Sequence, residues 1–588
     1  MVAWTSTLFS PLKEIDERLS LSHDVGVLWR ARNMLKEVDA AIAANKCTYP
    51  SVFMNAVAKY PTKEALVIDG ISYTFSELNR DSNRVANFFI KLGVKPHDIV
   101  PIFFENCAEF ILSFLGLLKA GATAACINSS LTGRSLAHCV NVAQGNMFVF
   151  ASDLAPAVKA VVSEIVGNPQ LVAMGSFSTS LDWAIRFSDV EMAQASPKDV
   201  NPEVYNGVGP DALSCLIYTS GTTGFPKGAI YTHKRIVGSS KAIFQLFRLS
   251  LDDRFYTAQP LYHSAALVIC FSTCMLNGMT CIVSKKFSAT QCFRDCKRYN
   301  ATVMQYIGEI CRYLLNTPVD PSNDRNHNVR LVVGNGLRPD MYHSRTDLGL
   351  RKLVNFMRLQ KELGLKFDVV KEEPVRDASG RCIECEVGEP GEMINELDPA
   401  RNREFAGYYR NEEGTNKKIL RNVFKEGDQW YRTGDLLKYD SYGRIYFVDR
   451  IGDTFRWKGE NVSTNEVAES INTYPGVEEA NVYGVAVPGK DGKAGMAAIV
   501  TNEEFKLQGL GEHIASRLPK YAVPLFIRIL PAMQVTQTFK HQKVALRNDG
   551  MDPGKVSDPM FMFDESSKSY IPFGFAEYKS IVDIKAKL

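Results

Sequence analysis

The sequence predicts an α/β protein with a large composite N-terminal domain of stacked α/β subdomains and a small α+β C-terminal domain. Three observations predict this architecture. The length of 588 residues exceeds what one compact domain usually holds. Short apolar runs alternate with helical stretches from residue 99 to 283, as in a sheet with crossover helices. After about residue 440 the pattern changes to short strands and one helix. We expect an N-terminal segment at 1–49, the large domain at 50–449 and the small domain at 450–588.

The N-terminal segment contains a predicted amphipathic helix. From Leu28 to Ile42 apolar residues recur at helical spacing, and charged residues lie off that stripe. One interpretation is a helix that packs on the body of the protein. The other is attachment to a membrane surface, which Trp29 and the neighbouring basic residues favour.

The large domain begins with a predicted β-hairpin, in which Asp69 and Gly70 form the turn. Its strands are Ala65–Ile68 and Ile71–Thr74, and a helix over Phe75–Leu92 follows. The next predicted elements are strands at Val100–Phe104, Ala122–Ile127 and Met147–Phe150, with a helix at Glu109–Leu118.

The segment from residue 264 to 284 carries no charge and is long enough to suggest a membrane span. Its interior contains Ser272, Thr273, Asn277 and Gly278, however. A buried helix, a glycine break and a buried strand at Met279–Val283 explain it at least as well, and we favour that interpretation. Further on, residues 347–364 are charged, with apolar residues at helical spacing.

The C-terminal part predicts a smaller α+β domain. Its expected strands are Ile445–Val448, Ala480–Val487 and Ala497–Thr501, and its expected helix lies near Gly509–Ser516.

Composition narrows the functional class. The 68 basic and 65 acidic residues leave a net charge of +3, so no global field recruits nucleic acid.

The 13 cysteines form no disulfide framework, and we expect reduced, buried thiols. Cys382 and Cys385 have the spacing of a redox or zinc half-site without a matching second pair. Residues 1–10 lack the features of a cleavable signal peptide, so we expect the chain to face the cytosol.

The most informative motif follows an apolar strand at Ala212–Ile217. Glycines let backbone N–H groups approach an anion, hydroxyl side chains add donors, and a lysine supplies a mobile positive charge. A flexible linker is the alternative, but linkers seldom place so many anion donors beside a buried strand. The predicted phosphate loop consists of Tyr218, Thr219, Ser220, Gly221, Thr222, Thr223, Gly224, Phe225, Pro226, Lys227 and Gly228. It is not the P-loop of nucleotide hydrolases, since a proline precedes the lysine and a glycine follows it.

This stretch resembles the signature of the adenylate-forming superfamily, which includes acyl-CoA synthetases, peptide-synthetase adenylation domains and luciferases. Other motifs support the resemblance from about residue 50 to 553. They are Pro260 to His263, Gly334 to Gly336, Tyr431 to Asp435, Asp449 with Arg450, and Arg456 to Thr464. Within the superfamily, the stretch from Tyr306 to Tyr313 resembles the branch of fatty acid transport proteins and very-long-chain acyl-CoA synthetases.

The resemblance implies the adenylate-forming fold with a mobile C-terminal domain, and an ATP-dependent ligase. A fatty acid would attack ATP to give acyl-AMP and pyrophosphate, and CoA thiolate would then displace AMP. Lys540 is the expected catalytic residue, with a solvated surface lysine as the alternative. Lys227 would hold the phosphates, and Asp435 and Arg450 the ribose, although Asp435 also fits a turn aspartate. The resemblance assigns further contacts to Gly334, Asn335 and Gly336 with adenine, to Gly459 with CoA, and to His263 and Tyr306 with the fatty acid. For His263, a structural role is the equally weighted alternative.

One family motif is missing. Tyr-Gly-x-Thr-Glu, whose glutamate helps to hold magnesium in the family, has no counterpart after Gly336. The resemblance thus implies ATP, CoA and magnesium as cofactors, but without that carboxylate the magnesium loses a hard oxygen ligand. No other metal ligand is predicted. Two functions stay open: a long-chain or very-long-chain fatty acid CoA ligase, and a binding or transport form of the same fold that has lost adenylation. The resemblance to the fatty acid transport protein branch argues against a third function, an adenylating enzyme that transfers the acyl group to an acceptor other than CoA.

The resemblance also implies partners and a location. Long-chain and very-long-chain fatty acids are the expected substrates, a membrane surface is an expected partner, and nucleic acid is not. A homo-oligomer stays open. Relatives usually carry an N-terminal membrane segment, whereas this chain begins with a polar stretch. We therefore expect peripheral association with the cytosolic face of the endoplasmic reticulum or plasma membrane.

Overall fold

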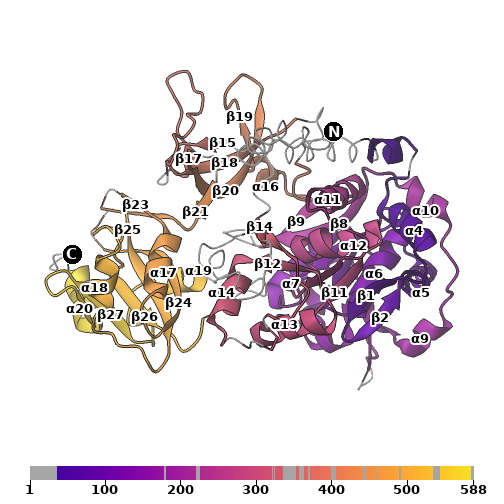
Figure 1. Ribbon diagram of the computed structural model, residues 1–588, viewed down its shortest axis with the longest axis horizontal. Coiled ribbons are helices and arrows are strands. Elements are labelled where there is room, and N and C mark those ends of the chain that lie inside the picture. The colour runs from indigo at the N-terminus through magenta and orange to yellow at the C-terminus, as the bar shows by residue number, and fades with distance from the viewer. Residues whose placement is uncertain are drawn as a thin grey trace, which may run out of the picture. The chain divides into compact units, whose positions relative to one another are not determined.

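The computed structural model divides the chain into two compact units (Figure 1). Unit 1 holds residues 1–354 and 406–412, and unit 2 holds 355–405 and 413–588. The predicted boundary at residue 449 stays a prediction. The structure describes residues 36, 38–44, 46–177, 181–219, 225–318, 320, 322–323, 325–335, 353–355, 363–368, 371–398, 405–441, 445–458, 460–488, 490, 492–533 and 543–583.

The first sheet of unit 1 has the strand order β7-β6-β5-β3-β4-β8-β9. Neighbouring strands are parallel, except that β9 runs antiparallel to β8 at one edge. The strands are β3 (Ile99–Phe103), β4 (Thr123–Ile127), β5 (Met147–Ala151), β6 (Gln170–Met174), β7 (Ile185–Phe187), β8 (Leu213–Thr219) and β9 (Lys227–Thr232). β3 and β4 are buried along their whole length, as expected for strands covered on both faces.

The second sheet of unit 1 has the order β14-β13-β12-β10-β11-β1-β2. The predicted hairpin of β1 and β2 is confirmed, and β1 also pairs in parallel with β11, which comes more than 200 residues later. The strands are β1 (Glu64–Ile68), β2 (Ile71–Thr74), β10 (Arg254–Thr257), β11 (Thr280–Val283), β12 (Val303–Ile307), β13 (Leu331–Asn335) and β14 (Leu353–Asn355). Residues 353–355 are thus a strand, although their segment has helical spacing; pairing in a sheet overrides local periodicity.

The helices of unit 1 precede, connect or follow the strands of both sheets. They are α4 (Tyr49–Lys59), α5 (Phe75–Lys91), α6 (Ala108–Lys119), α7 (Gly133–Ala143), α8 (Ala155–Lys159), α9 (Asp189–Gln194), α10 (Pro202–Gly207), α11 (His233–Leu246), α12 (Thr273–Asn277), α13 (Ala289–Arg298) and α14 (Gly308–Asn316). The short turns are η1 (Ser152–Leu154) and η2 (Val162–Glu164), and η3 (Ala265–Ser272) is a π-helix. The predicted helix at 75–92 is confirmed as α5, which starts with a capping box between Thr74 and Glu77.

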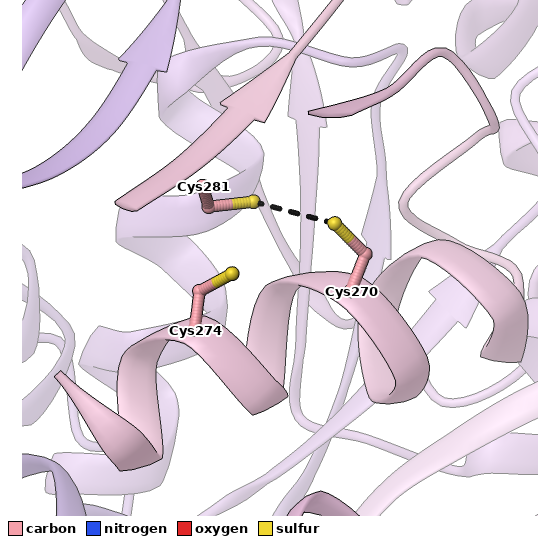
Figure 2. Close-up of side chains that lie close together, drawn as sticks. All are labelled: Cys270, Cys274 and Cys281. Atoms are coloured by element: carbon pink, nitrogen blue, oxygen red, sulfur yellow. Dashed lines mark hydrogen bonds between the residues drawn. The ribbon is translucent and has the colours of Figure 1, made fainter. Parts of the chain in front are cut away.

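The uncharged segment at 264–284 is a buried helix, a glycine break and a strand, as favoured from the sequence. The π-helix η3 runs directly into α12, Gly278 reverses the chain with φ of 78°, and β11 follows. Three cysteines of this segment approach one another in the interior (Figure 2). Among the described residues, no helix combines the length and apolar character needed to cross a bilayer.

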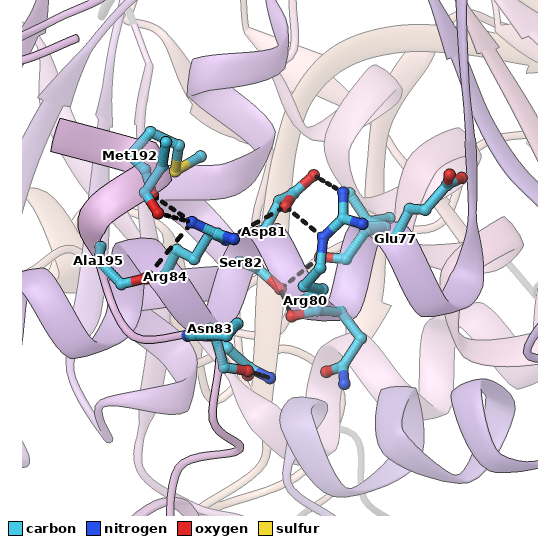
Figure 3. A network of polar contacts seen from close by, with 12 residues as sticks. Glu77, Arg80, Asp81, Ser82, Asn83, Arg84, Met192 and Ala195 are labelled. Carbon is cyan, nitrogen blue, oxygen red and sulfur yellow. Dashed lines mark hydrogen bonds and ion pairs between the residues drawn. The ribbon is translucent and has the colours of Figure 1, made fainter. Parts of the chain in front are cut away.

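A polar network joins α5 to the segment around α9 (Figure 3). The Arg84 guanidinium donates from Nη1 to the Met192 carbonyl at 2.7 Å and to the Ala193 carbonyl at 2.5 Å. Arg80 donates to Asp81 at 2.8 and 3.0 Å. The Arg84 bonds satisfy carbonyls in the last turn of the short α9, so they fix a segment with little core of its own.

Lys119, the last residue of α6, is fully buried beside α5. Its ammonium donates to Ser82 Oγ at 2.8 Å, Asn83 Oδ1 at 2.7 Å and Asn79 Oδ1 at 2.5 Å. Burial lowers the pKa of Lys119 to about 7, against a smaller opposing effect of Asp199. The packing of α5 on α6 is close here, since a Cβ on Gly116 would come within 2.9 Å of the Val85 side chain.

Unit 2 contains an antiparallel sheet in the order β15-β18-β20-β19, with β21 also paired to β20. Its strands are β15 (Leu363–Leu365), β18 (Gly391–Glu396), β19 (Ile419–Arg421), β20 (Gln429–Tyr439) and β21 (Ile445–Arg450). Two short pairs are β16 (Phe367–Asp368) with β17 (Glu373–Pro374), and β22 (Phe455–Trp457) with β23 (Glu460–Val462). The short helix α16 spans Glu412–Asn416.

The C-terminal part of unit 2 is an α+β layer, as predicted, around the sheet β24-β25-β26-β27-β28. The strands are β24 (Val477–Ala486), β25 (Lys493–Thr501), β26 (Phe526–Ile529), β27 (Met560–Asp564) and β28 (Ser569–Pro572). The helices are α17 (Thr464–Asn472), α18 (Leu510–Ala515), α19 (Lys543–Asp549) and α20 (Phe575–Val582). Apolar residues of these elements form one core, in which Tyr483, Met496 and Phe526 are fully buried.

Two predictions about single segments can be followed further. Within the predicted helix at 28–42, residue 36 and residues 38–42 are helical, and the others lie outside the described residues. All 13 cysteines are free, 12 of them buried, which confirms the reduced thiols. Burial raises the pKa of Cys385 to about 12.

Candidate functional site

The predicted phosphate loop joins two antiparallel strands at an edge of the first sheet. Thr219 ends β8 and pairs with Lys227, which begins β9. The Thr219 hydroxyl donates to the Lys227 carbonyl at 3.4 Å. The tip of the loop, Ser220, Gly221, Thr222, Thr223 and Gly224, lies outside the described residues. The hairpin therefore holds the lysine directly at the base of the loop.

A tyrosine from a remote part of unit 1 covers this lysine. Lys227 Nζ lies 5.7 Å from the ring centroid of Tyr408, within the range of a cation–π interaction. Backbone bonds hold the tyrosine segment along β9: Tyr409 N donates to the Gly228 carbonyl at 2.8 Å, and Ile230 N to the Gly407 carbonyl at 3.2 Å. Burial raises the pKa of Tyr408, partly offset by a hydrogen bond with Thr219, so the ring is neutral. Sequence reasoning missed Tyr408, because no motif or spacing links it to Lys227.

The residues on either side of the loop differ in their exposure. Tyr218 is buried, and its hydroxyl donates to the Cys139 carbonyl at 2.6 Å, so its side chain belongs to the core. Phe225 is exposed and stacks on His138 with ring centroids 4.7 Å apart. The His138 Nε2 atom lies 3.2 Å from the Pro226 carbonyl. These contacts anchor the second half of the loop to α7.

The second sheet brings three other predicted residues to one edge. His263 follows β10, Tyr306 is the second-to-last residue of β12, and Asn335 ends β13. These strands are parallel neighbours, so their carboxyl ends meet at the edge where α/β proteins bind ligands. His263 is half-buried and accepts from Ala265 N at 3.3 Å through Nδ1. Tyr306 is buried, and burial raises its pKa.

Gly334 lies on β13 directly opposite Tyr306. A Cβ at Gly334 would come within 2.0 Å of the Tyr306 carbonyl oxygen, so only glycine fits between the two strands. This packing explains Gly334 without a ligand, while the side chain of Asn335 is exposed at the strand end. Gly336 lies outside the described residues.

In unit 2 the expected ribose residues face each other. Asp435 on β20 pairs with Arg450 on β21, and Arg450 Nε lies 3.8 Å from Asp435 Oδ1. The side chains are 32% and 45% exposed, so both are open to a ligand. Asp435 lies inside a strand, and the preceding Gly434 takes the left-handed conformation with φ of 80°. The Asp435 amide donates to Thr433 Oγ1 at 3.1 Å, which fixes the backbone beside the carboxylate.

The expected catalytic lysine, Lys540, and the expected CoA contact, Gly459, lie outside the described residues. The elements next to them in sequence are well anchored. Lys543, at the start of α19, reaches Asp453 at 3.2 Å and donates to Thr464 Oγ1 at 2.8 Å. Arg547 pairs with the same aspartate at 2.7 Å. Burial raises the pKa of Asp453, but the charges of Lys543 and Arg547 outweigh it and keep the pKa low.

The described residues fit the nucleotide better than they fit magnesium. In unit 1 a lysine and a hydroxyl suit a phosphate, and in unit 2 an accessible carboxylate suits a ribose. Magnesium prefers hard oxygen ligands, and within the described residues the one cluster with metal-ligand spacing consists of three buried cysteines. Magnesium therefore gains no support from the part of the chain that the structure describes.

A cavity of about 340 Å³ in unit 1 contains none of the predicted site residues. It lies beside the network of Figure 3, and its lining includes Tyr73, Arg84, Glu109 and Asp189. Its two arginines already pair with Asp81 or with backbone carbonyls. The cavity mixes both signs of charge and offers no free cation for a phosphate.

The comparisons with family models and the comparisons with known proteins agree with one another. The AMP-binding enzyme family matches residues 53–355, and the AMP-binding enzyme C-terminal domain matches residues 466–540. The chain is 37% identical to long-chain fatty acid transport protein 2 of Rattus norvegicus over 607 residues, covering 97% of this chain and 96% of the relative. It is 33% identical to the very long-chain fatty acid transport protein of Cochliobolus heterostrophus, covering 98% and 94%. Because the 607 aligned positions outnumber the 588 residues here, the rat protein has residues with no counterpart in this chain.

Solved structures share the fold. An anthranilate CoA ligase in complex with anthranoyl-AMP superimposes with a TM-score of 0.70 at 18% identity, over 85% of this chain and 96% of that chain. A fatty acyl CoA synthetase of Mycobacterium tuberculosis gives a TM-score of 0.58 at 21% identity, over 85% and 98%. These likenesses confirm the expected architecture, a large α/β domain followed by a small C-terminal domain.

Proposed function

The chain belongs to the AMP-binding enzyme family and to its group of fatty acid transport proteins, and from this we propose that it is an ATP-dependent fatty acid CoA ligase. The substrates are long-chain and very-long-chain fatty acids, and the products are acyl-CoA, AMP and pyrophosphate. Conversion to the CoA ester traps the acyl chain and drives uptake. The position of Lys227 at the base of the phosphate loop carries the proposal.

The chemistry requires positioning and charge neutralisation rather than a protein nucleophile. Lys227 draws charge from the phosphates as pyrophosphate leaves, and the loop hydroxyls beside it donate to the same oxygens. Asp435 accepts hydrogen bonds from both ribose hydroxyls, and Arg450 holds that carboxylate in place. His263, Tyr306 and Asn335 line the side where the carboxylate and the adenine bind. Lys540 then acts between the carboxylate and the α-phosphate.

A second function, fatty acid binding or transport without adenylation, is favoured by one observation. The Tyr-Gly-x-Thr-Glu motif is missing from this sequence, and the rat relative has residues that find no counterpart here. Loss of its glutamate would weaken magnesium binding and leave the triphosphate less well neutralised. Both functions use the same fold, and the formation of acyl-CoA separates them.

The test is ATP-dependent acyl-CoA formation by the purified full chain with long and very long fatty acids. Two variants accompany the wild type: Lys540→Ala, and a chain in which the relatives' missing motif is restored. Lys520→Ala, an exposed lysine of the same C-terminal part, is the matched control. Activity in the wild type and Lys520→Ala but not in Lys540→Ala supports the ligase.

Two other outcomes decide against the ligase as proposed. If only the chain with the restored motif forms acyl-CoA, the wild type is a binding form. The wild type and the restored chain should then bind tritiated fatty acid equally well. Activity that survives Lys540→Ala would contradict the assignment of the catalytic lysine. We also propose that the protein associates peripherally with the cytosolic face of the endoplasmic reticulum or plasma membrane, where its substrates partition, and that CoA binds near Gly459.

A further inference from the structure

Three cysteine thiols converge in the interior of unit 1 (Figure 2). Cys270 lies on η3, Cys274 on α12 and Cys281 on β11. Their Sγ atoms all lie within 4.8 Å of one another, and Cys270 Sγ is 3.8 Å from Cys281 Sγ. All three side chains are 0% exposed.

The local fold creates this arrangement. Cys270 and Cys274 are four residues apart, which places them on one face of the helix. Gly278 then reverses the chain, so that β11 runs back past that face and presents Cys281 to it. Residues 255 and 66 of the adjacent strands pair with Cys281 on either side and hold it in register.

Charge decides which ligand suits the site. The charged side chain that acts on the trio is Asp253, an anion that acts on Cys274. Three thiolates around a monovalent or divalent metal would leave a net negative complex in this apolar interior, which is costly. Three thiolates around a trivalent centre give a neutral complex. A trivalent metalloid also enters as an uncharged hydroxide, whereas a metal ion would have to cross the core as a cation.

We propose that Cys270, Cys274 and Cys281 form a three-thiol site for trivalent arsenic. Arsenous acid, As(OH)₃, exchanges its three hydroxyls for the three thiols. Three S–H bonds and three As–O bonds break, three As–S bonds form, and three water molecules leave. No electrons are transferred, so neither oxidant nor reductant is needed.

The adduct would cross-link the π-helix η3 and α12 to β11 through its three As–S bonds. His263 lies two residues before η3, and the Ala265 carbonyl of that helix accepts from Gln305 of β12 at 2.6 Å. A cross-link in this helix therefore stiffens the support of a proposed substrate residue. Because a ligand that binds the folded state stabilises it, the adduct should also raise the melting temperature of unit 1.

The test treats the full chain with sodium arsenite in the presence of a phosphine reductant and measures intact mass under native conditions. A three-thiol adduct adds one arsenic atom and loses three hydrogens, whereas a two-thiol adduct retains a hydroxyl. X-ray absorption at the arsenic edge should count three sulfur neighbours. The melting temperature should rise on addition of arsenite.

Matched variants make the result specific. Cys281→Ala and Cys274→Ala should each abolish the three-sulfur adduct and the rise in melting temperature. Cys292→Ala, which removes another fully buried cysteine outside the trio, should change neither. Circular dichroism establishes that each variant is folded. The proposal is overturned if the wild type forms no adduct, if the adduct has two sulfurs, or if it persists in both trio variants.

Discussion

Tyr408 and Lys227 show what a single contact contributes at the base of the phosphate loop. The ring lies 5.7 Å from Nζ, so it restrains the ammonium without neutralising it. Replacing Tyr408 by Leu removes the ring, and we expect the Kd for ATP to rise about two- to fivefold, the value of an exposed cation–π interaction. Isothermal titration calorimetry measures this whether or not the chain turns over.

Tyr408→Phe is the control, because it keeps the ring and loses the hydroxyl. Its Kd for ATP should stay near that of the wild type. A loss equal to that of Tyr408→Leu would assign the effect to the hydroxyl and its contact with Thr219.

The charge of Lys227 should affect acyl-adenylate formation far more than the Tyr408 ring does. Lys227→Met preserves much of the side-chain volume but removes the charge that would face the departing phosphates. We expect acyl-adenylate formation to fall by about 10²-fold or more, typical of losing one electrostatic stabiliser of the transition state. Pyrophosphate release measures it, and a variant with normal release would contradict the assigned role.

Lys119 carries a pH prediction. Its folded pKa of about 7 lies below the value of about 10.4 in an unfolded chain, so between these values the unfolded state binds more protons. The cost of burying the charged lysine is fully present below about pH 7, and stability rises as the pH increases toward 10. In Lys119→Met the stability should not show this rise with pH, because methionine does not titrate. Scanning calorimetry at several pH values should show the melting temperature of the wild type gaining on that of the variant from pH 7 to 9.5.

A constant difference over that range would contradict the prediction. It would mean that the hydrogen bonds that the ammonium donates to Asn79, Ser82 and Asn83 keep it charged in the folded state. The absolute difference is not diagnostic, since the variant also leaves these acceptors unpaired.

At the scale of elements, the junction between α12 and β11 depends on one residue. Gly278 has φ of 78°, and a Cβ there would meet the Tyr60 ring at 2.5 Å. Gly278→Ala therefore combines a left-handed backbone with overpacking, and we expect a loss of roughly 2–4 kcal/mol. Gly93→Ala isolates the cost of the left-handed backbone, since Gly93 has φ of 98° and a Cβ there would meet nothing within 4 Å. Thermal melts of both variants should rank Gly278→Ala clearly below Gly93→Ala; equal losses would exclude the clash.

Local patterns predicted individual elements well and their pairing poorly. The hairpin of β1 and β2, helix α5 and strands β3, β4 and β8 all follow from periodicity and turn residues, to within one or two residues at most ends. The pairing of β1 with β11 does not, because partners more than 200 residues apart leave no mark on local sequence. For the same reason the motif located Lys227 but could not find Tyr408, which reaches it through tertiary pairing along β9. The thiol trio depends on how far the chain turns at Gly278, which composition cannot show.

For the molecule as a whole, a net charge of +3 is too small to hold it on a membrane by its overall field. Attachment then depends on local features, of which the predicted amphipathic helix at 28–42 is the strongest in the sequence. Deleting residues 1–44 should reduce co-sedimentation with vesicles of anionic phospholipid at least severalfold and leave the melting of both units unchanged. Undiminished co-sedimentation would favour the alternative, a helix that packs on the body.

The antiparallel edge of the first sheet has a consequence for biosynthesis. Strand β9 is complete at Thr232, yet the residues that pair with its outer side, Gly407 to Tyr409, come much later. At about 5–20 residues per second, the ribosome needs roughly ten to thirty-five seconds to add them. During that interval the nascent chain exposes an open strand edge, the surface on which misassembly starts. Slow codons between residues 233 and 409 should therefore lower the soluble yield, and chaperones that bind nascent chains should be needed most in this window.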